Sequence, residues 1–237
     1  MPKKIINISN LGDISFYKHH GSKTIKIRIS GSEVKVTLPT WVPYSVASDY
    51  VKKRSDWILA NRKPANYLYN GCIIGKNIKL NIQQNDSTRF SSKLLENYLI
   101  IKIPRNVDIN SKQAQSKIGQ IAKKAILSQS YNILLPHVRN LANQHKFDVK
   151  SIEIKELKSR WGSCSSKNEL SFSLYLIQLP WHCINYVIYH EFAHTIHHNH
   201  GSEFWDLVAK FEPKYRSIRK EMKHYSPELI PQNIKLM

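Results

Sequence analysis

Alternating hydrophobic and polar residues predict two pairs of β-strands in the first half of the chain. Isoleucines alternate with basic residues over residues 25–29, and after a Gly-Ser turn valines and a leucine alternate with polar residues over 34–38. An alternation of period two puts every second side chain on one face of a strand, so these segments predict a hairpin with one hydrophobic face. The same alternation recurs over residues 78–82 and 99–103, which are separated by a polar stretch.

A single helix is expected between these two strand pairs. Ser45 is its candidate N-cap, and the spacing of Tyr50, Trp57 and Ile58 places these side chains on its inner face. The helix is expected to end before Pro64, because proline removes a backbone donor and restricts the residue that precedes it.

Helical periodicity replaces the alternation after residue 105. Residues 105–111 form the expected crossing, and residues 112–145 follow a helical pattern that Pro136 is expected to kink or divide. Two further strands are predicted at 151–155 and 170–176.

The last part of the chain predicts three more helices. The first begins near Pro180, a hydrophobic helix covers 204–211, and a basic helix begins at Pro213. The whole pattern predicts an α+β fold, with a strand-rich N-terminal subdomain with one helix at residues 1–105 and a second, more helical domain at residues 106–237.

Composition is that of a folded globular protein. Of 237 residues, 41% are hydrophobic and 10% aromatic, which is enough to bury a core. The start of the chain lacks a signal-peptide pattern and no stretch reaches 18 apolar residues, so a soluble cytoplasmic protein without a membrane partner is expected. Cys72, Cys164 and Cys183 are odd in number and contain no C-x-x-C pair, so we expect reduced thiols.

The formal net charge of +19 has two interpretations. A strongly positive net charge is typical of proteins that bind nucleic acid or another polyanion. However, lysines occur in nearly every segment rather than in one block, which favours a solvated basic surface.

The strongest chemical signal is the run His190-Glu191-Phe192-Ala193-His194, which spells H-E-x-x-H. Positions four apart lie on one face of a helix, so His190 and His194 can present two imidazole nitrogens to one ion. Catalytic zinc takes three protein ligands and leaves one position to water, so a third ligand must come from outside this turn.

Four residues that follow the motif are candidates for the third ligand. His197 falls one turn too far along the helix, and His198 is expected at its exposed end. We expect His200, because Asn199-His200-Gly201 is typical of a reversal in chain direction. Glu203 is the alternative, since some zinc hydrolases use a carboxylate as the third ligand.

Glu191 stands next to the first ligand. In an H-E-x-x-H helix this carboxylate is placed to take a proton from the metal-activated water and pass it to the leaving amine. The reaction that this chemistry predicts is hydrolysis of an amide bond with one catalytic Zn²⁺.

Several segments beyond this motif together resemble one family. They are residues 158–164, Leu179-Pro180, Tyr186-Val187, the H-E-x-x-H helix, and His200 followed by Phe204-Trp205. In these segments the chain resembles the YgjP-like metallopeptidases, which are related to the SprT-like and WLM zinc peptidases. The resemblance implies a zincin-like C-terminal domain with His190, His194 and His200 as zinc ligands and Glu191 as the base.

The resemblance also places Arg160, Trp161 and Gly162 in a sheet beside the active-site cleft. These residues either form a strand that pairs with an extended substrate or set close packing beside the helix. No oxyanion-stabilising residue stands out. The candidates are Arg160, Tyr175, Tyr189 and Tyr225.

Three functions are therefore compared. The first is a zinc peptidase that acts on protein or peptide substrates. The second is a nucleic-acid-associated protein, either a protease recruited to DNA or a binding module with an accessory zinc site. The third is an inactive scaffold that keeps the fold without turnover.

Overall fold

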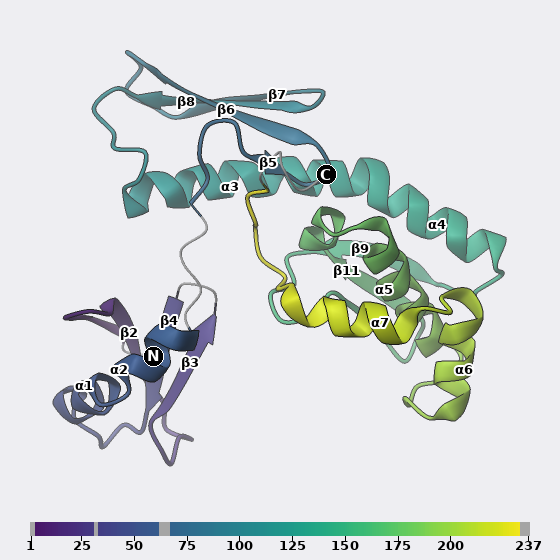
Figure 1. The fold of residues 1–237 in the computed structure, drawn as a ribbon, viewed down its shortest axis with the longest axis horizontal. Coiled ribbons are helices and arrows are strands. Elements are labelled where there is room, and N and C mark those ends of the chain that lie inside the picture. The colour runs from purple at the N-terminus through teal and green to yellow at the C-terminus, as the bar shows by residue number, and fades with distance from the viewer. Residues whose placement is uncertain (1–2, 31–32, 62–66, 233–237) are drawn as a thin grey trace. The chain divides into compact units, whose positions relative to one another are not determined.

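The computed structural model describes residues 3–30, 33–61 and 67–232, which form an α+β fold as predicted. The chain divides into two compact units, Met1–Asn66 and Tyr67–Met237 (Figure 1). We predicted a division at 105/106. The sheet that precedes residue 105 instead belongs to the second unit, because its inner side chains share one hydrophobic core with the helices that follow.

The N-terminal unit is built on a four-stranded sheet. Its strands are β1 (Lys3–Ile8), β2 (Gly12–Lys18), β3 (Lys26–Ser30) and β4 (Glu33–Leu38), in the order β1-β2-β4-β3. The antiparallel β3–β4 pair confirms the predicted hairpin, whose Gly-Ser turn lies outside the described residues. The sequence prediction missed β1 and β2, which pair antiparallel.

The helical segment of this unit is two helices rather than one, α1 (Tyr44–Lys52) and α2 (Ser55–Asn61). Ser45 is not the N-cap, because Pro43 occupies that position without a side-chain hydrogen bond. Ile58 is fully buried, but the neighbouring Trp57 is 48% exposed because successive helical side chains point about 100° apart. Pro64 lies outside the described residues.

The second unit begins with a sheet of four strands. They are β5 (Ile73–Ile74), β6 (Ile78–Asn85), β7 (Ser91–Leu95) and β8 (Tyr98–Pro104), in the order β5-β6-β8-β7. The two predicted alternating segments, β6 and β8, are parallel neighbours. Every residue of β7 is exposed, so this strand carries no hydrophobic alternation that a sequence pattern could reveal.

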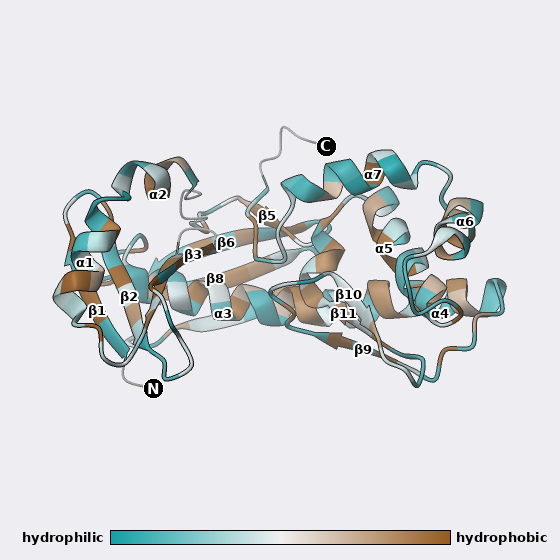
Figure 2. Cartoon of the chain, turned by 90° about the horizontal axis from the view of Figure 1, so that it is seen from below, coloured by the Kyte–Doolittle hydropathy of each residue, from teal (hydrophilic) through white to brown (hydrophobic). Residues whose placement is uncertain are grey.

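A long helical stretch continues the core of this unit (Figures 1 and 2). It comprises α3 (Lys112–Gln129), the π-helical turn Ser130–Leu134 and α4 (Leu135–Gln144). Ser111 caps α3 by accepting a hydrogen bond from the amide of Ala114. Pro136 lies in the first turn of α4, where a missing donor is tolerated, and the chain continues through the π turn.

A small sheet and three helices complete the unit. The strands are β9 (Ser151–Lys155), β10 (Gly162–Cys164) and β11 (Glu169–Ser173), in the order β10-β11-β9. The predicted strand at 170–176 is shorter, because the chain enters a 3-10 helix at Leu174–Gln178. Then follow α5 (Trp181–His194), α6 (Ser202–Phe211) and α7 (Tyr215–Glu221).

The central helix of this end is α5, which lies between the small sheet and α7 (Figure 1). Nine of its 14 residues are buried, so the helix is held by packing on several sides. Beyond α7 the chain returns to β5, where the Gln232 amide donates to Ile73 O at 2.8 Å. Among the described residues, no helix combines the length and apolar character needed to cross a membrane.

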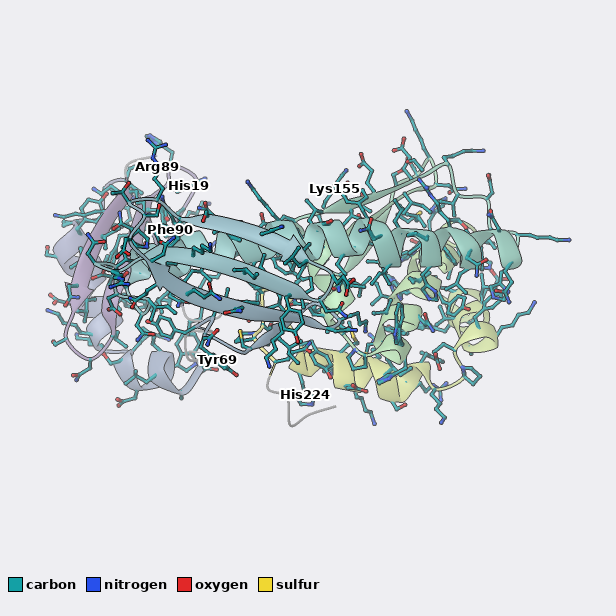
Figure 3. All side chains as sticks on the ribbon, turned by 90° about the horizontal axis from the view of Figure 1, so that it is seen from above. His19, Tyr69, Arg89, Phe90, Lys155 and His224 are labelled. Atoms are coloured by element: carbon teal, nitrogen blue, oxygen red, sulfur yellow. The ribbon has the colours of Figure 1, made fainter. Side chains whose placement is uncertain are left out.

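Positive charge is not gathered on one described element. Figure 3 shows side chains projecting from many parts of the second unit, among them Arg89 before β7 and Lys155 on β9. This distribution agrees with the lysine spread seen in the sequence.

Candidate active site

The helix α5 carries both histidines of the H-E-x-x-H run on one side, as the four-residue spacing predicts. The ring centroids of His190 and His194 are 5.0 Å apart. Since both residues stand in the last two turns of a helix that is buried on its other sides, their positions are fixed by the core rather than by a loop.

The structure brings His200 to this pair. After α5 the chain reverses and places the Nε2 atom of His200 3.2 Å from Nε2 of His190. Ligand nitrogens of all three histidines lie within 4.8 Å of one another. Tetrahedral Zn²⁺ with Zn–N bonds of about 2.05 Å needs N···N separations of about 3.3 Å, and the His190–His200 separation is already close to this value.

Of the other candidates for the third ligand, His198 lines the same pocket as His190 and His194, whereas His197 and Glu203 do not. Glu203 has a side chain that is 84% exposed, and its carboxylate faces His197 at 3.7 Å. The carbonyl oxygen of His197 is 3.2 Å from Nδ1 of His194. If this Nδ1 donates to the carbonyl, the Nε2 of His194 is left as a free lone-pair donor for a metal, an orientation common among metal-ligating histidines.

Phe204 supports all three histidines from the first turn of α6. Its ring centroid lies 5.0 Å from His190, 4.7 Å from His194 and 4.6 Å from His200. Phe204 is fully buried, so it forms a rigid hydrophobic wall behind the donor atoms. The sequence offered Phe204 only as part of a family pattern, because an aromatic residue on a hydrophobic helix is usually a core residue.

Burial keeps His190 neutral. Its pKa is lowered to about 3 by burial and by the nearby charges of His194, His200 and Arg219. Nδ1 of His190 is buried without a hydrogen-bond partner among the described residues. A neutral imidazole is the form that binds a metal, so the environment of His190 suits a ligand more than a charged surface histidine.

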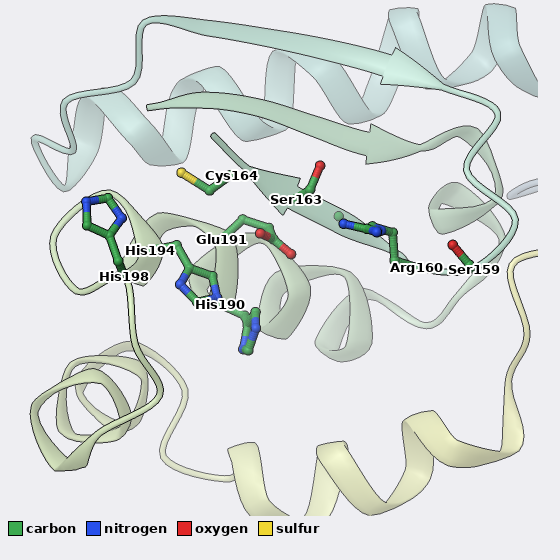
Figure 4. Close-up of a pocket in the computed structure, with 9 residues that line it drawn as sticks. Ser159, Arg160, Ser163, Cys164, His190, Glu191, His194 and His198 are labelled. Atoms are coloured by element: carbon green, nitrogen blue, oxygen red, sulfur yellow. The ribbon is translucent and has the colours of Figure 1, made fainter. Parts of the chain in front are cut away.

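Glu191 lies on the side of α5 that faces β10, and it is only 6% exposed (Figure 4). Burial raises its pKa to about 8, and the positive charge of Arg160 acts in the opposite direction. Gly162 makes this placement sterically feasible. A Cβ atom on Gly162 would lie 2.7 Å from Cγ of Glu191, well inside van der Waals contact.

An open pocket of about 580 Å³ lies between α5 and β10. Its lining residues come from the segment before β10, from β10 itself, and from α5 and the turn after it: Ser159, Arg160, Gly162, Ser163, Cys164, His190, Glu191, His194 and His198 (Figure 4). Trp161 is not among them and packs against the hydrophobic core. Arg160 and Gly162 thus lie at the pocket and Trp161 has a packing role, while the pairing of this segment with a substrate stays a prediction.

The backbone of β10 has a free edge. It is the edge strand of its sheet, and no other described strand pairs with its second side. The amide of Ser173 donates to Trp161 O at 2.8 Å, so these two residues form a hydrogen-bonded pair of the antiparallel ladder. Such pairs alternate, and the N–H and C=O groups of Gly162 and Cys164 therefore point away from β11.

Only one of the four candidate oxyanion stabilisers lies at the pocket. The Tyr175 hydroxyl donates to Glu156 at 2.9 Å, and the Tyr225 hydroxyl donates to Glu221 at 3.2 Å. The Tyr189 hydroxyl lies 3.4 Å from a ring nitrogen of His145. Arg160 lines the pocket, so it is the candidate that can contact a bound molecule.

Arg219 is a second cation near the site, and sequence reasoning did not single it out. Its guanidinium lies 4.9 Å above the ring of Trp205, whose centroid is 5.9 Å from that of His190. In the sequence Arg219 is one of several basic residues in a helix that reads as solvated, so only the tertiary packing reveals its position.

Comparison with known proteins gave a family match over most of the chain. The model of the family described as YgjP-like, metallopeptidase domain, matches residues 23–225, most of the chain. One solved structure, the metallopeptidase zymogen of Pyrococcus abyssi abylysin, is 21% identical, with 37% of this chain and 90% of that chain covered and a TM-score of 0.33. None of the curated proteins matches.

Proposed function

This chain belongs to the YgjP-like family of metallopeptidases, and we propose that it is a zinc-dependent peptidase that hydrolyses peptide bonds in protein or peptide substrates. The observation that carries the proposal is the convergence of His190, His194 and His200 beside the buried carboxylate of Glu191. Three imidazole nitrogens beside an open pocket match a catalytic zinc site better than a closed structural site.

The residues present fit Zn²⁺. Three imidazoles are a common ligand set for this ion, whereas Mg²⁺ and Ca²⁺ prefer oxygen ligands. When bound, the ion lowers the pKa of a water molecule and polarises the carbonyl of the scissile bond.

Glu191 is the proposed general base. Its carboxylate accepts a proton from the attacking water and donates that proton to the leaving amine nitrogen. The carboxylate must be ionised for the first step, and burial opposes ionisation. Arg160 favours the ionised form through its positive charge, so it supports the base as well as lining the pocket.

The free edge of β10 is the proposed substrate-binding element. An extended peptide that pairs with the outward N–H and C=O groups of Gly162 and Cys164 would lie along the pocket beside Glu191. Main-chain pairing holds a peptide in an extended form without selecting its side chains. We therefore expect cleavage of unfolded segments, in which the backbone is available.

The test compares wild type with Glu191→Gln on an unfolded protein substrate, with zinc content measured in both. We expect unchanged zinc content and a fall in kcat of about 10²–10⁴-fold, because the proton acceptor is lost while the ligands remain. The matched control is Glu203→Gln, since Glu203 is exposed and lies outside the pocket. Equal cleavage by wild type and Glu191→Gln would reject the assignment.

A further inference from the structure

A second group of metal-ligating side chains lies at the opposite end of α5. His182 and Cys183 stand in the first turn of this helix, and Glu221 is the last residue of α7. Nε2 of His182 is 2.9 Å from Oε2 of Glu221, and Sγ of Cys183 is 3.6 Å from Oε1 of the same carboxylate. One ligand atom from each residue lies within 4.8 Å of the other two.

This group is separate from the catalytic histidines. His182 and His190 are eight residues apart on one helix, which corresponds to about 12 Å along its axis at 1.5 Å per residue. None of His182, Cys183 and Glu221 lines the pocket that contains Glu191. An ion held here could not share ligands with the active site.

The two separations that involve Glu221, which join different oxygens of its carboxylate, lie close to those around a tetrahedral ion. Zn–N and Zn–O bonds near 2.1 Å and Zn–S bonds near 2.3 Å require ligand separations of about 3.4–3.6 Å. The Cys183–Glu221 distance already matches this range, and the His182–Glu221 distance must lengthen by about half an ångström. The side chains of His182 and Glu221 are 49% and 38% exposed, so an ion can enter and water can complete its coordination.

The immediate surroundings favour these orientations. Cys183 is fully buried in the hydrophobic core, and its thiol donates to a carboxylate at the edge of that core. The Tyr225 hydroxyl also donates to Glu221, which orients this carboxylate as outer-sphere partners orient metal ligands. One nearby positive charge, that of Lys76, opposes the binding of a metal cation. Its ammonium is bonded to the carbonyl of Leu179 and lies over the ring of Trp181.

We propose that His182, Cys183 and Glu221 form a second site for a divalent metal of the zinc class, which ties the start of α5 to the end of α7. A thiolate and a carboxylate together neutralise a dication, and the imidazole adds a neutral donor. Without metal the same atoms form a hydrogen-bonded cluster, with the Cys183 thiol donating to Glu221. Metal binding replaces the thiol proton, which is released to solvent.

Cobalt(II) titration of the full chain tests this site independently of peptidase activity. The double variant His190→Ala/His194→Ala removes two catalytic ligands. We expect it to bind one equivalent of Co²⁺ and to develop thiolate-to-cobalt charge-transfer absorption, which a three-histidine site cannot produce. Adding Cys183→Ser should abolish this absorption, whereas adding Cys164→Ser, the matched control in the catalytic pocket, should leave it intact.

A second pair of variants keeps the test valid if Cys183→Ser does not fold. His182→Ala and Glu221→Gln alter partly exposed side chains, and each should weaken cobalt binding by at least about tenfold, since even outer-sphere partners contribute this much. Absence of the absorption in the double variant, or its persistence in Cys183→Ser, would overturn the proposal. Either result would leave the peptidase proposal standing, because that proposal depends on Glu191 and the three histidines.

Discussion

Replacing Glu191 with glutamine is expected to stabilise the metal-free protein, and increasingly so as the pH rises. The carboxyl is 6% exposed and burial raises its pKa to about 8, from an ordinary value of 4.5. The folded chain therefore holds a proton that the unfolded chain releases above about pH 4.5. Between pH 4.5 and 8 the unfolded state binds fewer protons, so wild-type stability falls with rising pH.

The magnitude of the stability difference follows from how far the pKa of Glu191 is raised. One pKa unit corresponds to about 1.4 kcal/mol, so the full penalty above pH 8 is at most about 5 kcal/mol. Water that enters the open pocket screens part of it, and we expect Glu191→Gln to be more stable than wild type by about 2–5 kcal/mol at pH 8–9. At pH 5 both side chains are neutral in the folded state, and the difference should be small.

The assay is urea unfolding of both proteins in the presence of a chelator, at several values from pH 5 to pH 9. His190 also contributes to the pH dependence, because its lowered pKa means that stability is lost as the pH falls below about 6.5. This contribution is common to both proteins and cancels in their difference. Added Zn²⁺ should reduce the difference, since a nearby dication favours the ionised carboxylate.

Glu203→Gln is the control, because it removes an equal charge from a side chain that is 84% exposed. Its stability difference from wild type should stay near zero at every pH. Parallel curves for wild type and Glu191→Gln from pH 5 to pH 9 would refute the reasoning, because they would mean that Glu191 ionises in the folded state as easily as in water.

The other predictions concern the strand, the third ligand and the surface charge. Gly162→Ala should lower kcat/KM by about 10²-fold because the new Cβ displaces Glu191, whereas Gly119→Ala, with open space around its Cβ, should leave peptidase activity unchanged. His200→Ala should weaken zinc binding by at least about tenfold in a competition titration, and His197→Ala should not, since only the backbone carbonyl of His197 contacts His194. If the net charge of +19 serves nucleic-acid binding, affinity for DNA should fall about a thousandfold between 50 and 200 mM salt for six or more phosphate contacts, and a weak, flat response would remove that hypothesis.

Local periodicity accounts for the elements that were predicted correctly. The hairpin of β3 and β4 and the metal-binding face of α5 depend on residues two or four positions apart, so their geometry is set by the backbone of one element. The strand β7 was missed for the converse reason. Every residue of β7 is exposed, and its pairing with β8 depends on a neighbour rather than on its own pattern.

The compact units differ from the predicted domains for a similar reason. A change from strand to helix patterning at residue 105 is a change of element, whereas a unit is defined by a shared core. The inner residues of β6 and β8 pack with those of α3. A hydrophobic pattern in the sequence shows that a face will be buried, but not which element will cover it.

By itself, the sequence determined that His190 and His194 lie on one side of a helix with Glu191 between them, since a helix places side chains four residues apart on the same face. Only the tertiary structure showed that the His200 ring, rather than the Glu203 carboxylate, lies beside His190 and His194. It also showed that Gly162 contacts Glu191, and that burial raises the pKa of Glu191 to about 8. These properties depend on which segments fold back, how closely they pack and how much water they exclude. All three are set by contacts between residues distant in the chain.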